Sequence, residues 1–184
     1  PDAAREDGAL ADWIAKARRQ EDFKTSPGSV LQSYGMAGVK PRHLLVVACG
    51  QGQPREIRKA LRAAFNALQS AQVRSLSVHC ALQDVPASAV RSIVTELADA
   101  SYVYGHTLSK PQSRQLARVV IGLSTLSATH KTALQQAQAL VQGIELAKEW
   151  ANRPANHATP THLAQAARAL AKHPGVSCKV LGQK

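Results

Sequence analysis

The sequence predicts an α/β fold, with helices on both faces of a parallel or mixed sheet. Stretches in which apolar residues recur at helical spacing alternate along the chain with short stretches typical of strands. Residues 43–49 form an apolar run of the kind found in strands that are covered on both faces. Of the 184 residues, 45% are hydrophobic but only 4% are aromatic, so the core is expected to consist mainly of Ala, Val, Leu and Ile.

The first half of the chain is expected to contain two helices and three strands. Helical spacing of apolar residues predicts a helix at 9–20, and a short strand is expected at 30–34 after a Ser-Pro-Gly turn. The strand at 43–49 follows, and then an amphipathic helix at 54–71. Residues 73–80 alternate apolar and polar side chains, which is typical of a half-buried strand.

The second half continues the alternation. A helix opened by a proline is expected at 86–104, and a strand rich in Val and Ile at 116–123. A long helix at 129–151 carries an apolar stripe. A further helix at 162–172 and a strand at 176–181 are separated by a Pro-Gly pair.

These elements are expected to fall into two domains. Residues 1–149 form the predicted α/β domain, including the long helix, and residues 150–184 form a junction and the beginning of a second domain. A lone helix and strand cannot bury a core of their own. Residues from about 157 onward are therefore expected to pack on the first domain, on a second copy, or on sequence beyond Lys184. The start at Pro1, without a methionine, indicates a trimmed chain.

The junction, Trp150-Ala-Asn-Arg-Pro-Ala-Asn-His-Ala-Thr-Pro160, has an unusual local pattern. Pro154 cannot continue the preceding helix. Thr159 is a good helix N-cap, and Pro160 then sits at the first helical position, where its missing N–H costs nothing. Leu163 and Ala167 begin a new apolar stripe. An ordinary helix–loop–helix explains these residues one by one but not their joint spacing.

This segment resembles the "N-x-P-x-N-x-x-T-P-x-x-L-A" junction of the leucine aminopeptidases, which joins their N-terminal and catalytic domains. The long helix before it, the stretch from Leu97 to Tyr104 and the run Lys179-Val180-Leu181 are also similar to that family, whereas His106 and Thr107 depart from its pattern. The resemblance implies a macro-domain-like N-terminal domain. It further implies a cytoplasmic metalloprotease that removes N-terminal residues from peptides with two divalent metals, zinc or manganese, and that assembles as a hexamer.

The chemistry implied by the family is expected to lie outside this chain. The family's metal and catalytic blocks, "V-G-K-G-x-x-x-D-x-G-G" and "N-T-D-A-E-G-R-L", do not occur in the sequence. We therefore assign no catalytic and no metal-binding residue to this chain, and we expect it alone to be inactive and to serve assembly or regulation. Several carboxylates look like isolated helix-surface or loop residues: Asp84, Glu96, Asp99, Glu145 and Glu149.

Other groups of reactive residues carry weaker signals. Cys49, Cys80 and Cys178 are far apart and lie in or beside strand-like runs, so buried reduced thiols are expected and a metal or redox role has no support. The seven histidines lack the spacing of a zinc pair and are interpreted as surface or cap residues. The loop Gly50-Gln51-Gly52 follows a strand and precedes a helix, which is half of a phosphate-binding motif.

A basic face on the helix at 54–71 supports an alternative function. The net charge is +11, and Arg55, Arg58, Lys59 and Arg62 recur at i, i+3, i+4 and i+7. This spacing is that of a solvated helix face, or of a nucleic-acid contact on a stand-alone basic α/β module. No helix-turn-helix or zinc-finger pattern accompanies it, although some bacterial aminopeptidases bind DNA.

Membrane classes are not expected. No run of about 18 apolar residues occurs that could span a bilayer. The N-terminal residues are charged and lack the apolar core of a secretory signal.

Overall fold

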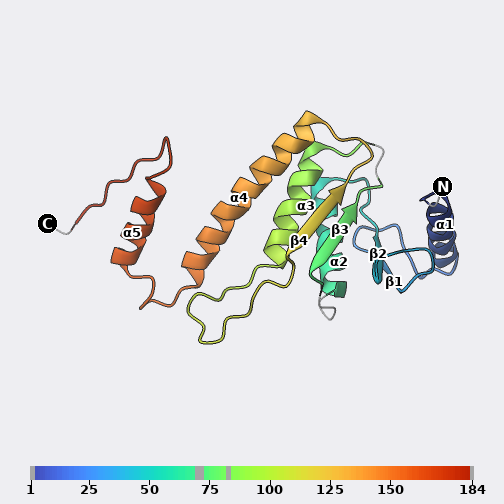
Figure 1. Cartoon of the computed structure of the whole chain (residues 1–184), viewed down its shortest axis with the longest axis horizontal. Helices are drawn as coiled ribbons and strands as arrows, with labels where there is room; N and C mark the ends of the chain where they lie inside the picture. Colours follow the sequence, from blue (N-terminus) through green and yellow to red (C-terminus); the bar gives the residue numbers. More distant parts are fainter. Residues whose placement is uncertain (1–2, 69–72, 82–83, 183–184) are drawn as a thin grey trace. The chain divides into compact units, whose positions relative to one another are not determined.

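The computed structural model describes residues 3–68, 73–81 and 84–182, with side chains described from Gly8 onward. These residues form two compact units. The first unit contains the chain up to Tyr102 together with Arg114–Val141. The second contains Val103–Ser113 and the chain from Gln142 onward. Helix α4, Ala128–Asn152, contributes residues to both units (Figure 1).

Most predicted elements of the first unit are confirmed. The strand β1 has the predicted bounds, and the predicted end of the second helix at residue 71 lies outside the described residues. Within the described residues, none of the helices combines the length and the apolar character that crossing a membrane requires. The elements that precede α4 are α1 (Ala3–Arg19), β1 (Val30–Tyr34), β2 (His43–Val47), α2 (Pro54–Leu68), β3 (Ser75–His79), α3 (Ala87–Ala100) and β4 (Arg118–Gly122).

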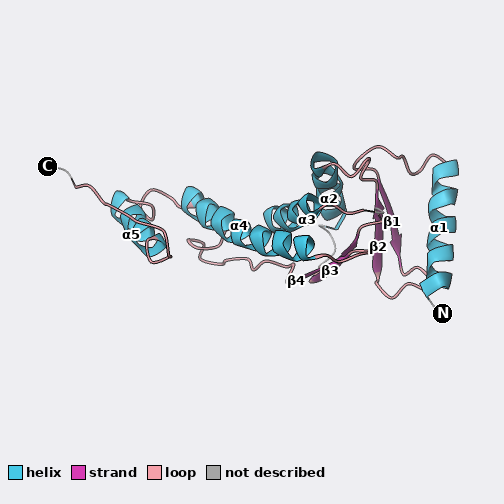
Figure 2. Ribbon diagram, turned by 90° about the horizontal axis from the view of Figure 1, so that it is seen from above, coloured by secondary structure: helices cyan, strands magenta, loops and turns pink. Residues whose placement is uncertain are grey.

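Strands β1 and β2 form an antiparallel pair. Val30 lies opposite Val47 at one end of the pair, and Tyr34 lies opposite His43 at the turn. Gly35 begins the turn with a φ of 62°, a left-handed conformation that glycine adopts without steric cost, and its N–H donates to the carbonyl of Arg42. Helix α1 lies on one side of this pair and α2 on the other (Figure 2).

Strands β3 and β4 form a parallel pair connected through α3. Ser75 lies opposite Arg118, and His79 opposite Gly122. Helices α2 and α3 lie on one side of this pair (Figure 2). The core of the unit sits there, because Leu76, Val78 and Ile121 of the strands pack against apolar side chains of the two helices. That helical cluster consists of Ile57, Leu61, Ala89, Ile93 and Leu97. Full burial of one such Ile or Leu side chain contributes roughly 1.5–3 kcal/mol to stability.

The sheet itself differs from the prediction. Among the described strands there are two separate two-stranded sheets, one antiparallel and one parallel, instead of one mixed sheet. Among the described helices, α2 and α3 lie on one face of the β3–β4 pair, and on its other face Ser77 is exposed and Val120 is 40% exposed. The prediction was wrong here because a hydropathy pattern shows which side chains are apolar, not which strand edges meet.

Helix α3 ends earlier than the sequence indicates, at Ala100 instead of near Tyr104. A distant arginine contacts this end of the helix. Arg114 donates from Nε to the carbonyl of Ser101 at 3.1 Å and from Nη2 to the carbonyl of Ala98 at 3.3 Å. The Ser101 hydroxyl also donates to the carbonyls of Leu97 and Ala98, at 2.6 and 3.4 Å, so local and distant donors together satisfy the carbonyls at the helix end.

The second unit is less regular. It contains the C-terminal part of α4, the helix α5 (Pro160–Leu170) and an extended tail. The predicted strand at 176–181 is not formed, and these residues are exposed, with Leu181 at 79%. The physical reason is that a strand needs a neighbour to accept and donate backbone hydrogen bonds, and no described strand lies beside this segment.

Candidate functional site

The junction between α4 and α5 has the local geometry that its sequence predicts. Thr159 has an extended backbone, and its Oγ1 accepts from the His162 N–H, so it is the N-cap of α5. Before it, the N–H groups of His157 and Ala158 donate to the carbonyl of Pro154 at 2.8 and 3.0 Å. The connector is thus a tight turn between a proline that ends one helix and a cap that begins the next.

Arg153 is the best-packed charged residue of this junction. Its guanidinium carbon lies 3.8 Å from the centre of the Trp150 ring, and its Nη2 pairs with the Glu149 carboxylate. The Arg153 side chain is only 13% exposed, and its buried Nε has no hydrogen-bond partner among the described residues. The Glu149 carboxylate also faces His106, with Nδ1 at 3.6 Å. The Arg153 guanidinium thus contacts both the Trp150 ring and the Glu149 carboxylate. These contacts hold the backbone in place where it leaves α4.

Sequence reasoning missed this cluster. It treated Glu149 as an isolated carboxylate and gave Arg153 no role of its own. The signal that could have found it was the i, i+4 spacing of Glu149 and Arg153, which places a carboxylate and a guanidinium on one helix face.

The predicted basic face on α2 is split among three environments. Arg62 pairs with Glu96 at 2.7 Å and lies 3.7 Å from an oxygen of Asp99, both on α3. The aliphatic stem of Lys59 lies over Gly28, where a β-carbon would be 3.4 Å from it. Arg55 and Arg58 are exposed. The Arg62 guanidinium is therefore paired within the fold, whereas Lys59 contributes only its aliphatic stem.

The prediction for Glu96 was wrong. Its side chain is only 8% exposed, whereas the sequence placed it on a helix surface. Arg62 donates to it from both Nε and Nη2, at 2.8 and 2.7 Å, so the buried charge has a two-point partner. Glu96 is thus a structural ion-pair residue that joins α3 to α2.

The loop Gly50-Gln51-Gly52 already holds an anion of the protein's own. The backbone N–H groups of Gln51 and Gln53 both donate to Glu56 Oε2, at 2.9 and 3.1 Å. Glu56 lies in the first turn of α2, where a carboxylate is favoured by the helix dipole. The backbone donors that a phosphate would need are thus occupied by Glu56.

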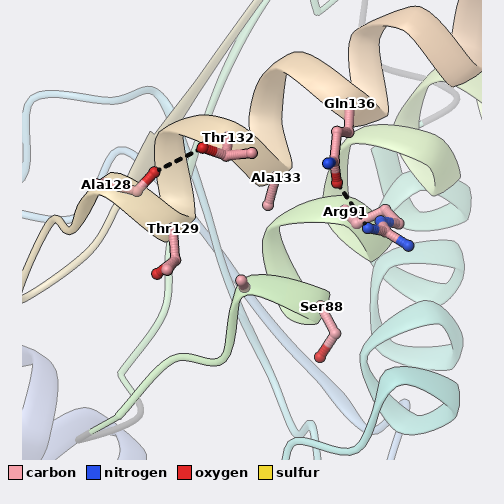
Figure 3. Close-up of a pocket in the computed structure, with 8 residues that line it drawn as sticks. Ser88, Arg91, Ala128, Thr129, Thr132, Ala133 and Gln136 are labelled. Carbon is pink, nitrogen blue, oxygen red and sulfur yellow. Dashed lines mark hydrogen bonds between the residues drawn. The ribbon is translucent and has the colours of Figure 1, made fainter.

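A shallow hollow of about 350 Å³ lies between α3 and the part of α4 that belongs to the first unit (Figure 3). Arg91 Nη2 donates across it to Gln136 Oε1 at 3.0 Å. Hydroxyls of Ser88, Thr129 and Thr132 and alanine side chains complete its lining. The lining contains neither a carboxylate nor a histidine nor a thiol, so it offers no acid–base pair and no metal ligand.

His130 ties the start of α4 to Val85, two residues before α3. Its Nε2 lies 2.7 Å from the carbonyl oxygen of Val85, which can only accept, so Nε2 carries the proton. Its Nδ1 then accepts from the Ser127 N–H at 3.2 Å. His130 and His162 therefore serve at helix N-termini.

The cysteines divide into two groups. Cys49 and Cys80 are half-buried, whereas Cys178 is exposed, which corrects the expectation that all three are buried. Cys178 is exposed because the strand expected around it is not formed. Burial, and secondarily the charge of Cys49, raise the pKa of the Cys80 thiol.

No group of three or more His, Cys, Asp or Glu side chains that could hold a metal ion occurs within the part of the chain that the structure describes. The assignment of no metal or catalytic residue to this chain remains a prediction.

Comparison with known proteins supplies the deciding observation. Residues 1–111 match the model of the cytosol aminopeptidase family, N-terminal domain. The chain belongs to the cytosol aminopeptidase family. Curated relatives described as probable cytosol aminopeptidases include one from Albidiferax ferrireducens, 42% identical over 95% of this chain and 36% of the relative. Another, from Acidovorax, is 39% identical over 94% of this chain and 34% of the relative.

Solved structures agree with the family assignment. A mutant of tomato leucine aminopeptidase superposes with a TM-score of 0.71 at 25% identity, covering 91% of this chain and 34% of that one. The bottromycin maturation enzyme BotP in complex with Mn gives 0.65 at 26% identity, covering 86% of this chain and 33% of that one. The chain spans about a third of the length of the curated cytosol aminopeptidases that it matches.

Proposed function

We propose that this chain is the N-terminal region of a leucyl-type aminopeptidase that removes N-terminal amino acids from peptides in the cytoplasm with two divalent metals. The observation that carries the proposal is the extent of the likeness. About 95% of this chain aligns with about a third of each cytosol aminopeptidase relative. BotP was solved with Mn, which supports manganese, with zinc as the alternative, as the metal of the whole enzyme.

The chain's own contribution is assembly or regulation. The second unit supports this role, because apolar side chains of α5 and the tail are exposed although they follow a core-like pattern. In the whole enzyme these side chains pack against further protein, either the catalytic part or another subunit of a hexamer. They are Leu163, Leu170, Val176, Val180 and Leu181.

An activity measurement tests whether the peptidase activity is absent from the 1–184 chain. The purified 1–184 chain, its mass verified, is incubated with leucine p-nitroanilide in the presence of Mn²⁺ or Zn²⁺. We expect no release of nitroaniline above a protein-free blank, while intact tomato leucine aminopeptidase, assayed in parallel, is active. Hydrolysis by the chain alone that survives repurification would contradict the proposal.

The whole enzyme is tested through its complete reading frame. We expect the full-length product to hydrolyse the same substrate, to lose activity in EDTA and to regain it with Mn²⁺. Analytical ultracentrifugation of the same product tests the hexamer. A full-length product that binds Mn²⁺ but leaves leucine peptides intact would rule out the leucyl-type activity.

A second candidate function is nucleic-acid binding. The net charge of +11 favours it, and so do the exposed guanidinium groups of Arg55 and Arg58. With Arg62 paired to Glu96, the contact surface on α2 reduces to Arg55, Arg58 and the ammonium of Lys59.

Duplex DNA binding at two salt concentrations tests this surface. The double variant R55E/R58E should weaken binding by more than the matched control R18E/R19E, which changes the net charge equally at the end of α1. The slope of the logarithm of its binding constant against the logarithm of salt concentration should also fall, by the amount expected for the loss of about two phosphate contacts. Equal losses in both variants would show that net charge alone attracts the DNA.

A further inference from the structure

Two cysteines that are distant in sequence lie at neighbouring positions in the fold of the first unit. Cys49 follows the end of β2 by two residues, and Cys80 directly follows β3. Both side chains pack against the same cluster of α2 and α3, which includes Ile57 and Ile93. The two thiols therefore contact the same apolar cluster.

Electrostatics gives a second indication that the thiols are close. After burial, the next contribution to the raised pKa of Cys80 is the charge of Cys49. The interaction between two charges weakens with distance, so this effect requires proximity. Cys178 makes no such contribution, and it is exposed in the second unit.

The backbones around both cysteines are held in place. The Cys80 N–H donates to the carbonyl of Gly122 at 3.2 Å, and the Gly52 N–H donates to the carbonyl of Cys49 at 3.0 Å. The sulfur atoms are therefore presented from ordered strand ends and not from long loops, which favours one pairing over others.

We propose that Cys49 and Cys80 form an oxidation-sensitive thiol pair that closes into an intramolecular disulfide in the presence of a disulfide oxidant such as oxidised glutathione. One thiolate attacks a glutathione sulfur, which forms a mixed disulfide and releases one glutathione. The second thiol loses its proton and attacks the protein sulfur of this mixed disulfide, releasing the other glutathione. Two protein thiols are oxidised to one disulfide, and one oxidised glutathione is reduced to two thiols.

The order of attack follows from burial. Burial raises the pKa of the Cys80 thiol, which lowers its thiolate fraction, and the thiolate is the nucleophile. Cys49 is therefore assigned the first attack, and Cys80 resolves the mixed disulfide.

The Cys49–Cys80 disulfide would join two parts of the first unit whose described strands are not hydrogen-bonded to each other. Among the described strands, β1–β2 and β3–β4 are separate sheets, connected through side-chain packing on α2 and α3. A disulfide between Cys49 and Cys80 links the two sheets covalently. It closes the segment that contains α2 and so reduces the entropy of the unfolded chain. Oxidation should accordingly raise the Tm of the chain, and a reductant should reverse the increase.

Peptide mapping tests the pairing directly. The reduced, folded 1–184 chain is treated with oxidised glutathione, its remaining thiols are alkylated, and it is digested with trypsin. Trypsin places each cysteine in its own peptide: 43–55 for Cys49, 75–91 for Cys80 and 173–179 for Cys178. We expect a linked 43–55/75–91 pair and an alkylated or glutathionylated 173–179.

Variants and a denatured sample serve as controls. C178S should retain the link and the Tm increase, and C49S and C80S should each lose both. In denaturant the selectivity should disappear, so that 173–179 joins the linked peptides. The proposal is overturned if the folded wild-type chain links Cys178 to either partner. It is equally overturned if Cys49 accumulates as an unresolved glutathione adduct, or if both thiols stay free. These outcomes are independent of peptidase activity.

Discussion

The two units of this chain are stabilised by different means. The first unit buries an apolar cluster between α2, α3 and the β3–β4 pair, with Ile93 at 1% exposure. The second unit is organised around a charged and aromatic cluster of Trp150, Glu149 and Arg153, while α5 and the tail leave apolar side chains exposed. The first unit thus buries its apolar pattern, whereas apolar side chains of the second unit, such as Leu163 and Leu181, stay exposed in the part of the chain that the structure describes.

The largest effect that separates the units is expected from the core. Ile93→Ala should lower the free energy of unfolding by about 2–5 kcal/mol, because it removes a fully buried side chain and leaves a cavity. Leu163→Ala is the matched change in α5, where the side chain is 47% exposed, and it should cost well under ~1 kcal/mol. Urea unfolding followed by circular dichroism measures both. Equal losses would show that α5 carries a core of its own in the isolated chain.

The next largest effect concerns the ion pair of the first unit. Arg62→Ala should cost about 1–3 kcal/mol, because it leaves the buried Glu96 carboxylate without its two-point partner. The neighbouring Arg58→Ala changes an exposed cation and should stay within about 0.5 kcal/mol. The same unfolding experiment compares them. Comparable stabilities for the two variants would mean that water reaches Glu96 in solution.

A smaller and more local effect is expected in the second unit. Arg153→Ala removes the stacking on Trp150 and the pair with Glu149, together worth about 1–2 kcal/mol. Hydrogen exchange of the amides from Trp150 to Thr159 should accelerate, while amides of α2 stay unchanged. Arg168→Ala in α5 is the matched control and should leave the junction amides as they are. Acceleration that spreads equally into α2 would argue against a local role.

The smallest expected effect is the pH dependence set by Cys80. Burial, and then the charge of Cys49, raise the pKa of the Cys80 thiol in the folded chain above its ordinary value of 9.0. The contribution of this residue to stability is therefore fully present below about pH 9 and is lost as pH rises through the folded pKa. Under reducing conditions, the wild type should lose more stability than Cys80→Ser between neutral and strongly alkaline pH. Parallel curves for the two proteins would contradict this linkage.

Local features of the fold were predictable from sequence. Residues 30–34 form the expected strand, and Thr159 caps α5 as its position before Pro160 indicates. In both cases the determining contacts lie within a few residues. Sequence spacing also identified the alternation of helices and strands, because each element shows its own period.

Features that depend on distant partners were not predictable in the same way. Arg114 binds the carbonyls at the end of α3 from a distant segment, and the buried Glu96 carboxylate is paired with Arg62 of another helix. The tail at 176–181 has the composition of a strand but no described neighbour to pair with. The helical spacing of the basic residues on α2 was predicted correctly. Their surroundings were not, because Arg62 pairs with Glu96 whereas Arg55 and Arg58 are exposed.

The contact between Gly50 and Glu56 has a consequence for how this gene can change. A β-carbon at position 50 would lie 2.5 Å from Glu56 Oε1, and the backbone there has a φ of 58°. Replacing Glu56 alone would leave the N–H groups of Gln51 and Gln53 without their acceptor. An alanine at position 50 would therefore displace the Glu56 carboxylate from this loop, and it would also meet Pro27 and adopt a φ that side-chain-bearing residues rarely take. The glycine codon at position 50 and the glutamate codon at position 56 are thus constrained by one loop conformation.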